Sequence, residues 1–212
     1  LFQQLKFASR RESASLFMIL VAAFQTLLFC HSRQEDVRVG TLIANRNRSE
    51  TEDLLGLFVN TVVLRSNFSG DPTYREALQR VRRVVLEAFN NQDLPFEQLL
   101  QVLERERDLD RTALIEMLFI LQNAPLQPLD LPGLRVSHIQ EVSDLADAGV
   151  TLTMFDLILM MGEGPDGLTA SLKYKTELFD ESTIRRLFDE FVQVLESIVS
   201  QPDEKLVNTV TR

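Results

Sequence analysis

A nearly unbroken apolar stretch close to the amino terminus limits the folds that are open to this chain. The apolar residues 16–24 and 27–29, separated by the polar pair Gln25 and Thr26, lie in a predicted helix over residues 12–30. A helix that is apolar almost all round must be covered on several sides. The apolar run is shorter than the roughly 20 residues that a bilayer-spanning helix needs, and no small-residue cleavage site follows it. We therefore predict a central helix buried inside a larger fold.

The rest of the chain alternates helix and strand patterns. Apolar residues spaced by three and four follow Asp71 and Pro72, which suit a helix start, and a similar stripe follows Asp180 and ends before Pro202. A shorter helix is predicted from Pro95 to residue 103. Strands are predicted over residues 37–44, 57–65, 115–121, 135–142, 151–161 and 168–176, with a loop at 126–133 and a hairpin turn at 162–167. This order predicts an α/β fold in one structural unit, a mixed β-sheet flanked by helices.

Charge and cysteine content exclude several classes of protein. The chain has 31 acidic and 22 basic residues, a formal net charge of -9. An acidic surface repels phosphate backbones and anionic lipids, so neither nucleic acid nor membrane is an expected partner. The single cysteine, Cys30, rules out an internal disulfide framework and a cysteine-rich zinc site, and it fits a reducing, cytoplasmic environment.

The residues alone do not supply a complete active site. The only histidines are His31, which follows the apolar helix and suits its carboxyl end, and His138, which lies in a predicted strand. Cys30 has no activating neighbour and is predicted to be buried and inert. The carboxylates of residues 104–110 alternate with arginines, a pattern typical of a solvated, ion-paired segment. We therefore predict neither a catalytic residue nor a metal site within the chain.

Three ordered motifs resemble those of a known family. Residues 54–65 (LLGLFVNTVVLR) are similar to IGxFVNTxxxR, residues 90–100 (NNQDLPFEQLL) to (H/N)QDxPFExLV, and residues 107–114 (RDLDRTAL) to RDxSRxPL. These motifs belong to the condensation domains of nonribosomal peptide synthetases. The resemblance also includes residues 39–48, 119–123 and 172–187 and covers nearly the whole chain.

The resemblance implies a specific architecture and reaction. Condensation domains consist of two chloramphenicol-acetyltransferase-like lobes with the active site in a tunnel between them, and residues 1–212 resemble the C-terminal lobe. The catalytic histidine motif HHxxxDG belongs to the N-terminal lobe and does not occur in this sequence. The whole domain forms an amide bond between aminoacyl or peptidyl thioesters held on the phosphopantetheine arms of carrier proteins. The implied partners are therefore carrier proteins, the N-terminal lobe and adjacent synthetase domains, and the chain alone is expected to be inactive.

Five polar residues are candidates for the tunnel or the surface between the lobes. Residues 45–53 are expected to belong to the loop that forms the tunnel floor. Asn60 either ties its strand to a loop or faces the tunnel, and the first is favoured because buried amides are usually bonded to nearby backbone. Arg46 has the same two interpretations, a structural pair or a charge facing the other lobe. The candidates are Asn45, Arg46, Asn60, Gln122 and Asn123.

Other motif residues are expected to serve folding. Asp93 is predicted to cap the helix that begins at Pro95, and Phe96 to anchor that helix to the core. Arg65 is expected to form an ion pair that fixes the loop, which is favoured over a charge turned toward the other lobe. Ion pairs of the third motif are expected to hold the strand that follows it; these residues are Arg107, Asp108 and Arg111.

Two alternatives to an amide-forming condensation lobe stay open. One is a lobe of a related heterocyclisation or ester-forming enzyme, which would differ in the upstream histidine motif. The other is a non-catalytic scaffold or docking module. Ala113 stands where the third motif usually has proline, and the epimerisation signature FNYLGQ is replaced by FILQN at residues 119–123, which argues against an epimerisation domain.

Overall fold

The fold is described from a computed structural model of the chain, which covers residues 1–46, 49–52, 54–106, 114–122, 155–164 and 167–208. The predicted strand at 135–142 and the loop at 126–133 lie outside these residues. The described elements are α1 (Phe2–Arg11), α2 (Leu16–Ser32), β1 (Asp36–Ile43), α3 (Ser49–Glu52), β2 (Asn60–Asn67), α4 (Tyr74–Asn90), α5 (Phe96–Glu106), β3 (Met117–Gln122), β4 (Leu157–Gly164), β5 (Gly167–Tyr174), α6 (Glu181–Ser200) and the 3-10 turn η2 (Leu206–Asn208).

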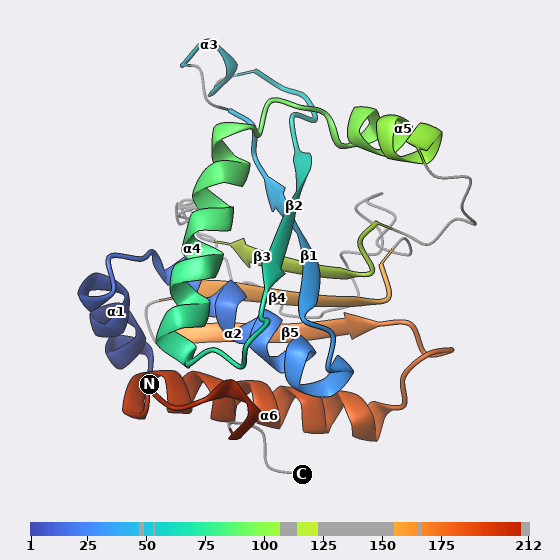
Figure 1. Cartoon of the computed structure of the whole chain (residues 1–212). Helices are drawn as coiled ribbons and strands as arrows, with labels where there is room; N and C mark the ends of the chain where they lie inside the picture. Colours follow the sequence, from blue (N-terminus) through green and yellow to red (C-terminus); the bar gives the residue numbers. More distant parts are fainter. Residues whose placement is uncertain (47–48, 53, 107–113, 123–154, 165–166, 209–212) are drawn as a thin grey trace, which may run out of the picture.

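The strands form one five-stranded mixed sheet in the order β2-β1-β3-β4-β5. Its two outer pairs, β1 with β2 and β4 with β5, are antiparallel, while β3 is parallel to both β1 and β4. The strands β1 and β3 are paired only at Gly40–Leu118 and Thr41–Phe119. In Figure 1, β1 and β2 are drawn nearly upright, whereas β3, β4 and β5 are drawn nearly horizontal. The predicted α/β class with a mixed, helix-flanked sheet is confirmed.

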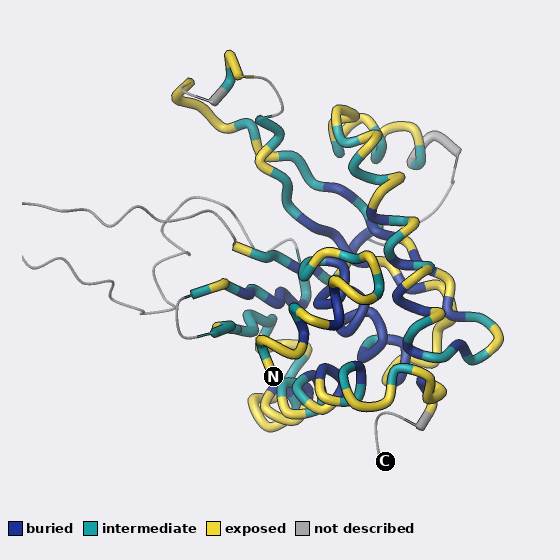
Figure 2. Tube along the Cα trace, turned by 90° about the vertical axis from the view of Figure 1, so that its left-hand side faces the viewer, coloured by how far each residue is buried: buried dark blue, intermediate teal, exposed yellow. Residues whose placement is uncertain are grey.

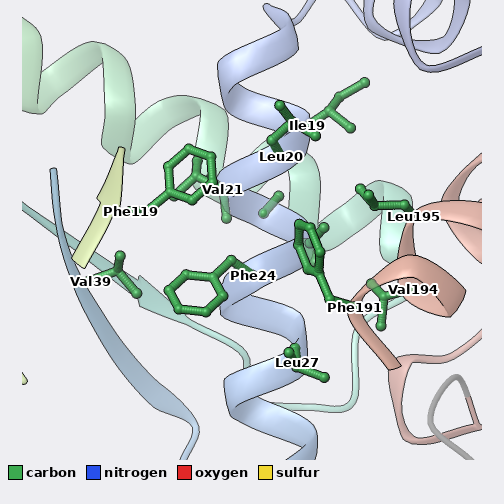
Figure 3. Close-up of a cluster of buried hydrophobic side chains, with 14 of the residues drawn as sticks. Ile19, Leu20, Val21, Phe24, Leu27, Val39, Phe119, Phe191, Val194 and Leu195 are labelled. Carbon is green, nitrogen blue, oxygen red and sulfur yellow. The ribbon is translucent and has the colours of Figure 1, made fainter. Parts of the chain in front are cut away.

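The central helix α2 is buried, as predicted. It packs against α1, α4, α6 and the strands β1 and β3. Figure 3 shows Phe24 and Leu27 among side chains of α6, β1 and β3. Most of its residues are buried, including both polar residues of its middle, Gln25 and Thr26. Among the described residues no single helix is long and apolar enough to cross a bilayer; α1 and α2 reach that length only together and are bent by 102°.

Two helices begin later than predicted because a different residue caps each. The helix α2 starts at Leu16 rather than residue 12, since Ser15 accepts a hydrogen bond from the Met18 N–H. The helix α4 starts at Tyr74, since Thr73 caps it and not Asp71. Asp71 has a left-handed backbone (φ 47°), which ends any helical run at that point. The predicted stripe of α4 is nevertheless buried against the sheet and α2.

Strand boundaries also shift in places. The strand β2 begins three residues later than predicted and runs two residues further, with alternating rather than continuous burial because it lies at the sheet edge. The strand β4 starts at Leu157, and its predicted hairpin with β5 is confirmed by antiparallel pairing from Leu157–Tyr174 to Gly164–Gly167. Asp180 occupies the N-cap position of α6 but makes no side-chain cap bond.

Residues 201–207, which we call the clip, fold back onto the start of α4. The carbonyl oxygens of Pro202 and Glu204 accept hydrogen bonds from the N–H groups of Arg75 (2.9 Å) and Tyr74 (3.1 Å). Leu206 is fully buried and its N–H bonds the Pro72 carbonyl at 3.2 Å. The clip therefore supplies partners for helix N–H groups that have none within α4.

Candidate functional site

The connection between β1 and β2 projects from the body of the molecule, and we call residues 44–59 the arm. It contains the short helix α3 (Ser49–Glu52) and rises beyond the end of the sheet in Figure 1. Figure 2 shows that much of the described arm is exposed, in contrast to the buried centre of the chain. The arm contains the candidates Asn45, which has a left-handed backbone (φ 52°), and Arg46.

Arg46 holds the arm together from inside. Its guanidinium group donates to the carbonyl oxygens of Leu54 (2.9 Å) and Gly56 (3.1 Å), and also to that of Thr51. The same group lies over the ring of Phe58, 4.4 Å from its centroid. The planar, multiply donating guanidinium suits this combination of carbonyl bonds and ring contact. Of its two predicted roles, the geometry supports a structural one, through bonds to carbonyl groups of the arm.

The arm carries apolar side chains that face solvent. Leu55 is fully exposed, and Leu57, where the predicted strand of residues 57–65 should begin, is 85% exposed. Exposed apolar residues that gather in one region are typical of interaction sites, whereas single exposed residues are not, and four such residues lie within residues 54–59. We call this surface the apolar tip; it consists of Leu54, Leu55, Leu57, Val59 and Leu94.

Asn60 joins the base of the arm to the segment before α5. Its Nδ2 donates to the carbonyl oxygens of Gln92 (2.9 Å) and Leu94 (2.8 Å). Its Oδ1 accepts from the N–H groups of Thr61 (2.9 Å) and Phe96 (3.1 Å). The side chain therefore ties the start of β2 to a turn more than 30 residues away along the chain, which is the structural interpretation favoured above.

The second motif forms a turn and the exposed helix α5. Asp93 and Pro95 are exposed, and Phe96, predicted to anchor the helix in the core, is half-buried. The first N–H of α5 bonds Asn60 rather than the predicted cap Asp93. Figure 1 shows α5 apart from the other large helices, next to the end of β2. No signal close to Asp93 in the sequence pointed to Asn60 as the residue that binds this helix end.

The remaining candidates are spread over the molecule. Arg65 forms a bidentate pair with Asp36 at 2.9–3.1 Å on the exposed edge of the sheet, the predicted ion pair. Gln122 is exposed at the end of β3, opposite Gly162 of β4. The structure thus brings Asn60 and Phe96 together, but no described contact joins Gln122 to them. Four predicted residues lie outside the described residues: Arg107, Asp108, Arg111 and Asn123.

The titratable groups that the structure describes do not form a reaction centre. His31 contacts Glu190 of α6 on the surface. Burial raises the pKa of the Cys30 thiol to about 11, which keeps it protonated and unreactive at neutral pH. In the described part of the chain, no group of His, Cys, Asp or Glu side chains has a metal-binding arrangement. A hollow of about 380 Å³ between α1 and α6 is lined by Gln3, Gln4, Phe7, Ala8, Arg11 and Val199 and contains no nucleophile or base.

Comparison with known proteins identifies the class of this chain. Residues 1–211 match the family model of the condensation domain, so the chain belongs to the condensation-domain family of nonribosomal peptide synthetases. It is 47% identical over 206 residues to one of the proteins that make up the linear gramicidin synthase of Brevibacillus parabrevis. That match covers 97% of this chain and 4% of the synthase protein, so the chain corresponds to a small part of such an enzyme.

Solved structures share the fold. The first condensation domain of the calcium-dependent antibiotic synthetase, in complex with a substrate analogue, matches with a TM-score of 0.74 at 16% identity, over 98% of this chain and 43% of that one. The X-domain from teicoplanin biosynthesis, in its complex with OxyB, matches with a TM-score of 0.78 at 24% identity, over 98% of this chain and 45% of that one. The fold is therefore the chloramphenicol-acetyltransferase-like fold of condensation domains, and the chain spans less than half of either structure.

Proposed function

We propose that the chain is the C-terminal lobe of an amide-forming condensation domain and supplies wall, floor and docking surface to its substrate tunnel. The observation that carries the proposal is the apolar tip. The side chains of the tip are exposed in this chain. The chain matches less than half of the length of a solved condensation domain, so the rest of such a domain could cover them. An N-terminal lobe of the domain is the partner that we propose for the tip.

In this proposal the chemistry needs little from the lobe beyond shape. The α-amine of an aminoacyl group on one carrier protein attacks the thioester carbonyl carbon on a second carrier. The C–N bond forms, the C–S bond breaks, and the amine proton is transferred so that the pantetheine leaves as a thiol. Holding amine and thioester together supplies much of the acceleration, and a closed tunnel excludes water that would hydrolyse the thioester. The residue that handles the proton belongs to the proposed N-terminal lobe, since HHxxxDG does not occur in this sequence.

A chimeric synthetase tests this function. Residues 1–212 replace the matching segment of the linear gramicidin synthase protein to which they are 47% identical, and peptide formation is measured. We expect product from the chimera and none from the isolated chain. Turnover by the isolated chain, or a folded chimera that makes no peptide, would contradict the proposal.

Matched leucine variants test the role of the tip. Leu57→Asp and Leu178→Asp both change a leucine that is more than half exposed, but Leu178 lies between β5 and α6, away from the arm. We expect a charge at Leu57 to lower peptide formation about tenfold, by making its burial against the other lobe unfavourable, and Leu178→Asp to leave it unchanged. Equal rates for the two variants would remove the tip from the interface.

A binding module is the second candidate function. It is favoured by the X-domain, which has the same fold and whose solved structure is a complex with OxyB. Under this alternative the domain that contains this chain would bind a partner protein, and the chimera would fold without forming peptide. The product of the chimera would distinguish the heterocyclisation and ester-forming variants from an amide-forming domain.

We place the protein in the cytoplasm, where carrier-bound thioesters are made.

A further inference from the structure

We propose that Asn60 is a positioning residue that fixes α5 relative to the arm, so that both meet the rest of the domain as one preformed surface. That this surface contacts an N-terminal lobe of the domain rests on the proposed function. The coupling itself rests on contacts within this chain and is testable without any assay of peptide formation.

The amide of Asn60 uses its hydrogen-bonding groups on two separate segments. An asparagine side chain offers two N–H donors and one oxygen with two lone pairs. Both donors go to the turn before α5, to the carbonyls of Gln92 and Leu94. One lone pair binds the Thr61 N–H in β2 and the other the Phe96 N–H at the start of α5. The side chain is therefore fully used, and all but one of its bonds cross to the segment that contains α5.

The helix α5 has few other attachments. Its apolar residues Leu99, Leu100 and Leu103 are only half-buried, and Val102 is 55% exposed. Its main described contact is with β2. No side chain of residues 96–103 forms a hydrogen bond with another described element. A helix held by so little packing depends strongly on each polar contact at its start.

The same contact links α5 to the apolar tip. Leu94, whose carbonyl binds Asn60, is itself a tip residue and is 50% exposed. On the other side Asn60 directly follows Val59, the last tip residue of the arm. Loss of the Asn60 amide therefore separates the part of the tip on the arm from the part before α5. A surface that must be assembled on contact binds less tightly than a preformed one.

Hydrogen exchange in the whole chain tests the coupling. Asn60→Ala removes every bond, whereas Asn60→Asp keeps the two acceptor bonds and replaces the two donor bonds with repulsion between a carboxylate oxygen and the carbonyl oxygens of Gln92 and Leu94. Asn67→Ala is the control in the same strand, where the side chain accepts only the Ser69 N–H. We expect amides of residues 92–103 to exchange about tenfold faster in Asn60→Ala, because the anchored segment opens locally.

Asn60→Asp separates the two parts of the contact. We expect faster exchange mainly in residues 92–95, with the first turn of α5 still protected through the retained Phe96 bond. Asn67→Ala should match the wild type in this region. Wild-type exchange at residues 92–103 in both Asn60 variants, or equal acceleration throughout the chain, would overturn the proposal.

The chimera then tests the consequence for function. We expect kcat/KM for peptide formation to fall about tenfold in Asn60→Ala, to fall in Asn60→Asp as well and to stay unchanged in Asn67→Ala, with unchanged melting temperatures. Faster exchange at α5 with an unchanged kcat/KM would also overturn the positioning role. An inactive wild-type chimera would count against the proposed function alone, since the exchange result does not depend on it.

Discussion

The guanidinium carbon of Arg46 lies 4.4 Å from the centroid of the Phe58 ring, and its nitrogens bond carbonyl groups on the same arm. Lysine keeps the charge but lacks the planar group that makes these contacts together. We therefore expect Arg46→Lys to loosen the arm and to speed chymotrypsin cleavage near Phe58 about tenfold. Arg83→Lys, at an exposed position of α4, is the control. Equal cleavage of the two variants would show that Arg46 does not hold the arm.

The buried pair Gln25 and Thr26 should respond in opposite ways to apolar substitution. Gln25 donates to the Leu64 carbonyl and accepts from the Ser66 hydroxyl, both at 2.9 Å. Gln25→Leu leaves the Ser66 hydroxyl without this partner and should lower the free energy of unfolding by about 1–3 kcal/mol. The Thr26 hydroxyl has no hydrogen-bond partner among the described residues, so Thr26→Val should be neutral or stabilising. Urea unfolding of both variants measures this, and the reverse order would contradict it.

The single cysteine should be unreactive in the folded chain. Burial is the main cause that raises the Cys30 pKa from 9.0 to about 11, and the thiol contacts the Leu206 carbonyl at 3.4 Å. We expect a thiol reagent at pH 8 to label Cys30 only after the chain is unfolded. Rapid labelling of the native chain would show that the site opens readily.

The same pKa makes stability depend on alkaline pH. The folded state holds the Cys30 proton more tightly than the unfolded state does. The folded state therefore has its full stability below pH 9 and loses part of it as the pH rises towards 11. The loss is at most about 3 kcal/mol for a difference of this size. We expect Cys30→Ala to lose less stability than the wild type between these pH values. Identical pH profiles would contradict the assignment to Cys30.

The exposed pair of Arg65 and Asp36 should contribute little to folding. A hydrogen bond from Arg65 is the main cause that lowers the pKa of Asp36. The pair therefore stabilises the folded state at pH values above the ordinary aspartate pKa, and this stabilisation is lost as the pH falls below that value. Both side chains are largely in solvent, so Arg65→Ala should lower the free energy of unfolding by less than about 1 kcal/mol. A much larger loss would show that Arg65 is part of the core structure. Strong loss of chimera activity with little loss of stability would place Arg65 on the interface.

Periodic patterns predicted the core of the fold. The apolar character of α2 required burial on several sides, and α1, α4, α6 and the sheet supply it. The stripes of α4 and α6 follow the helical repeat, and most of their predicted residues are buried. Such patterns are informative because they show which side of a single helix or strand is apolar, whatever elements lie next to it.

Contacts between distant segments could not be predicted from the sequence. Thr73 and Asp71 are both good caps, and only the backbone of the folded chain decides between them. Residues 57–59 have the composition of a strand, yet Leu57 and Val59 are exposed on the arm. The helix α1 has only Leu5 and Ala8 as buried apolar residues and an exposed Phe7, so its pattern was too weak to predict it. The partners of Asn60 lie 32 to 36 residues away, apart from Thr61.

The clip sets a boundary for exchanging parts between synthetases. Arg75 binds Asp203 of the clip and Glu12, which follows α1, so the two ends of the described chain are fastened to the same helix. A fusion joint placed before Pro202 would remove the carbonyl partners of two N–H groups of α4, and one placed before Leu206 would open the space that this leucine fills. Joints for recombinant synthetases therefore belong after residue 207, so that the whole clip is kept with the helix that it binds.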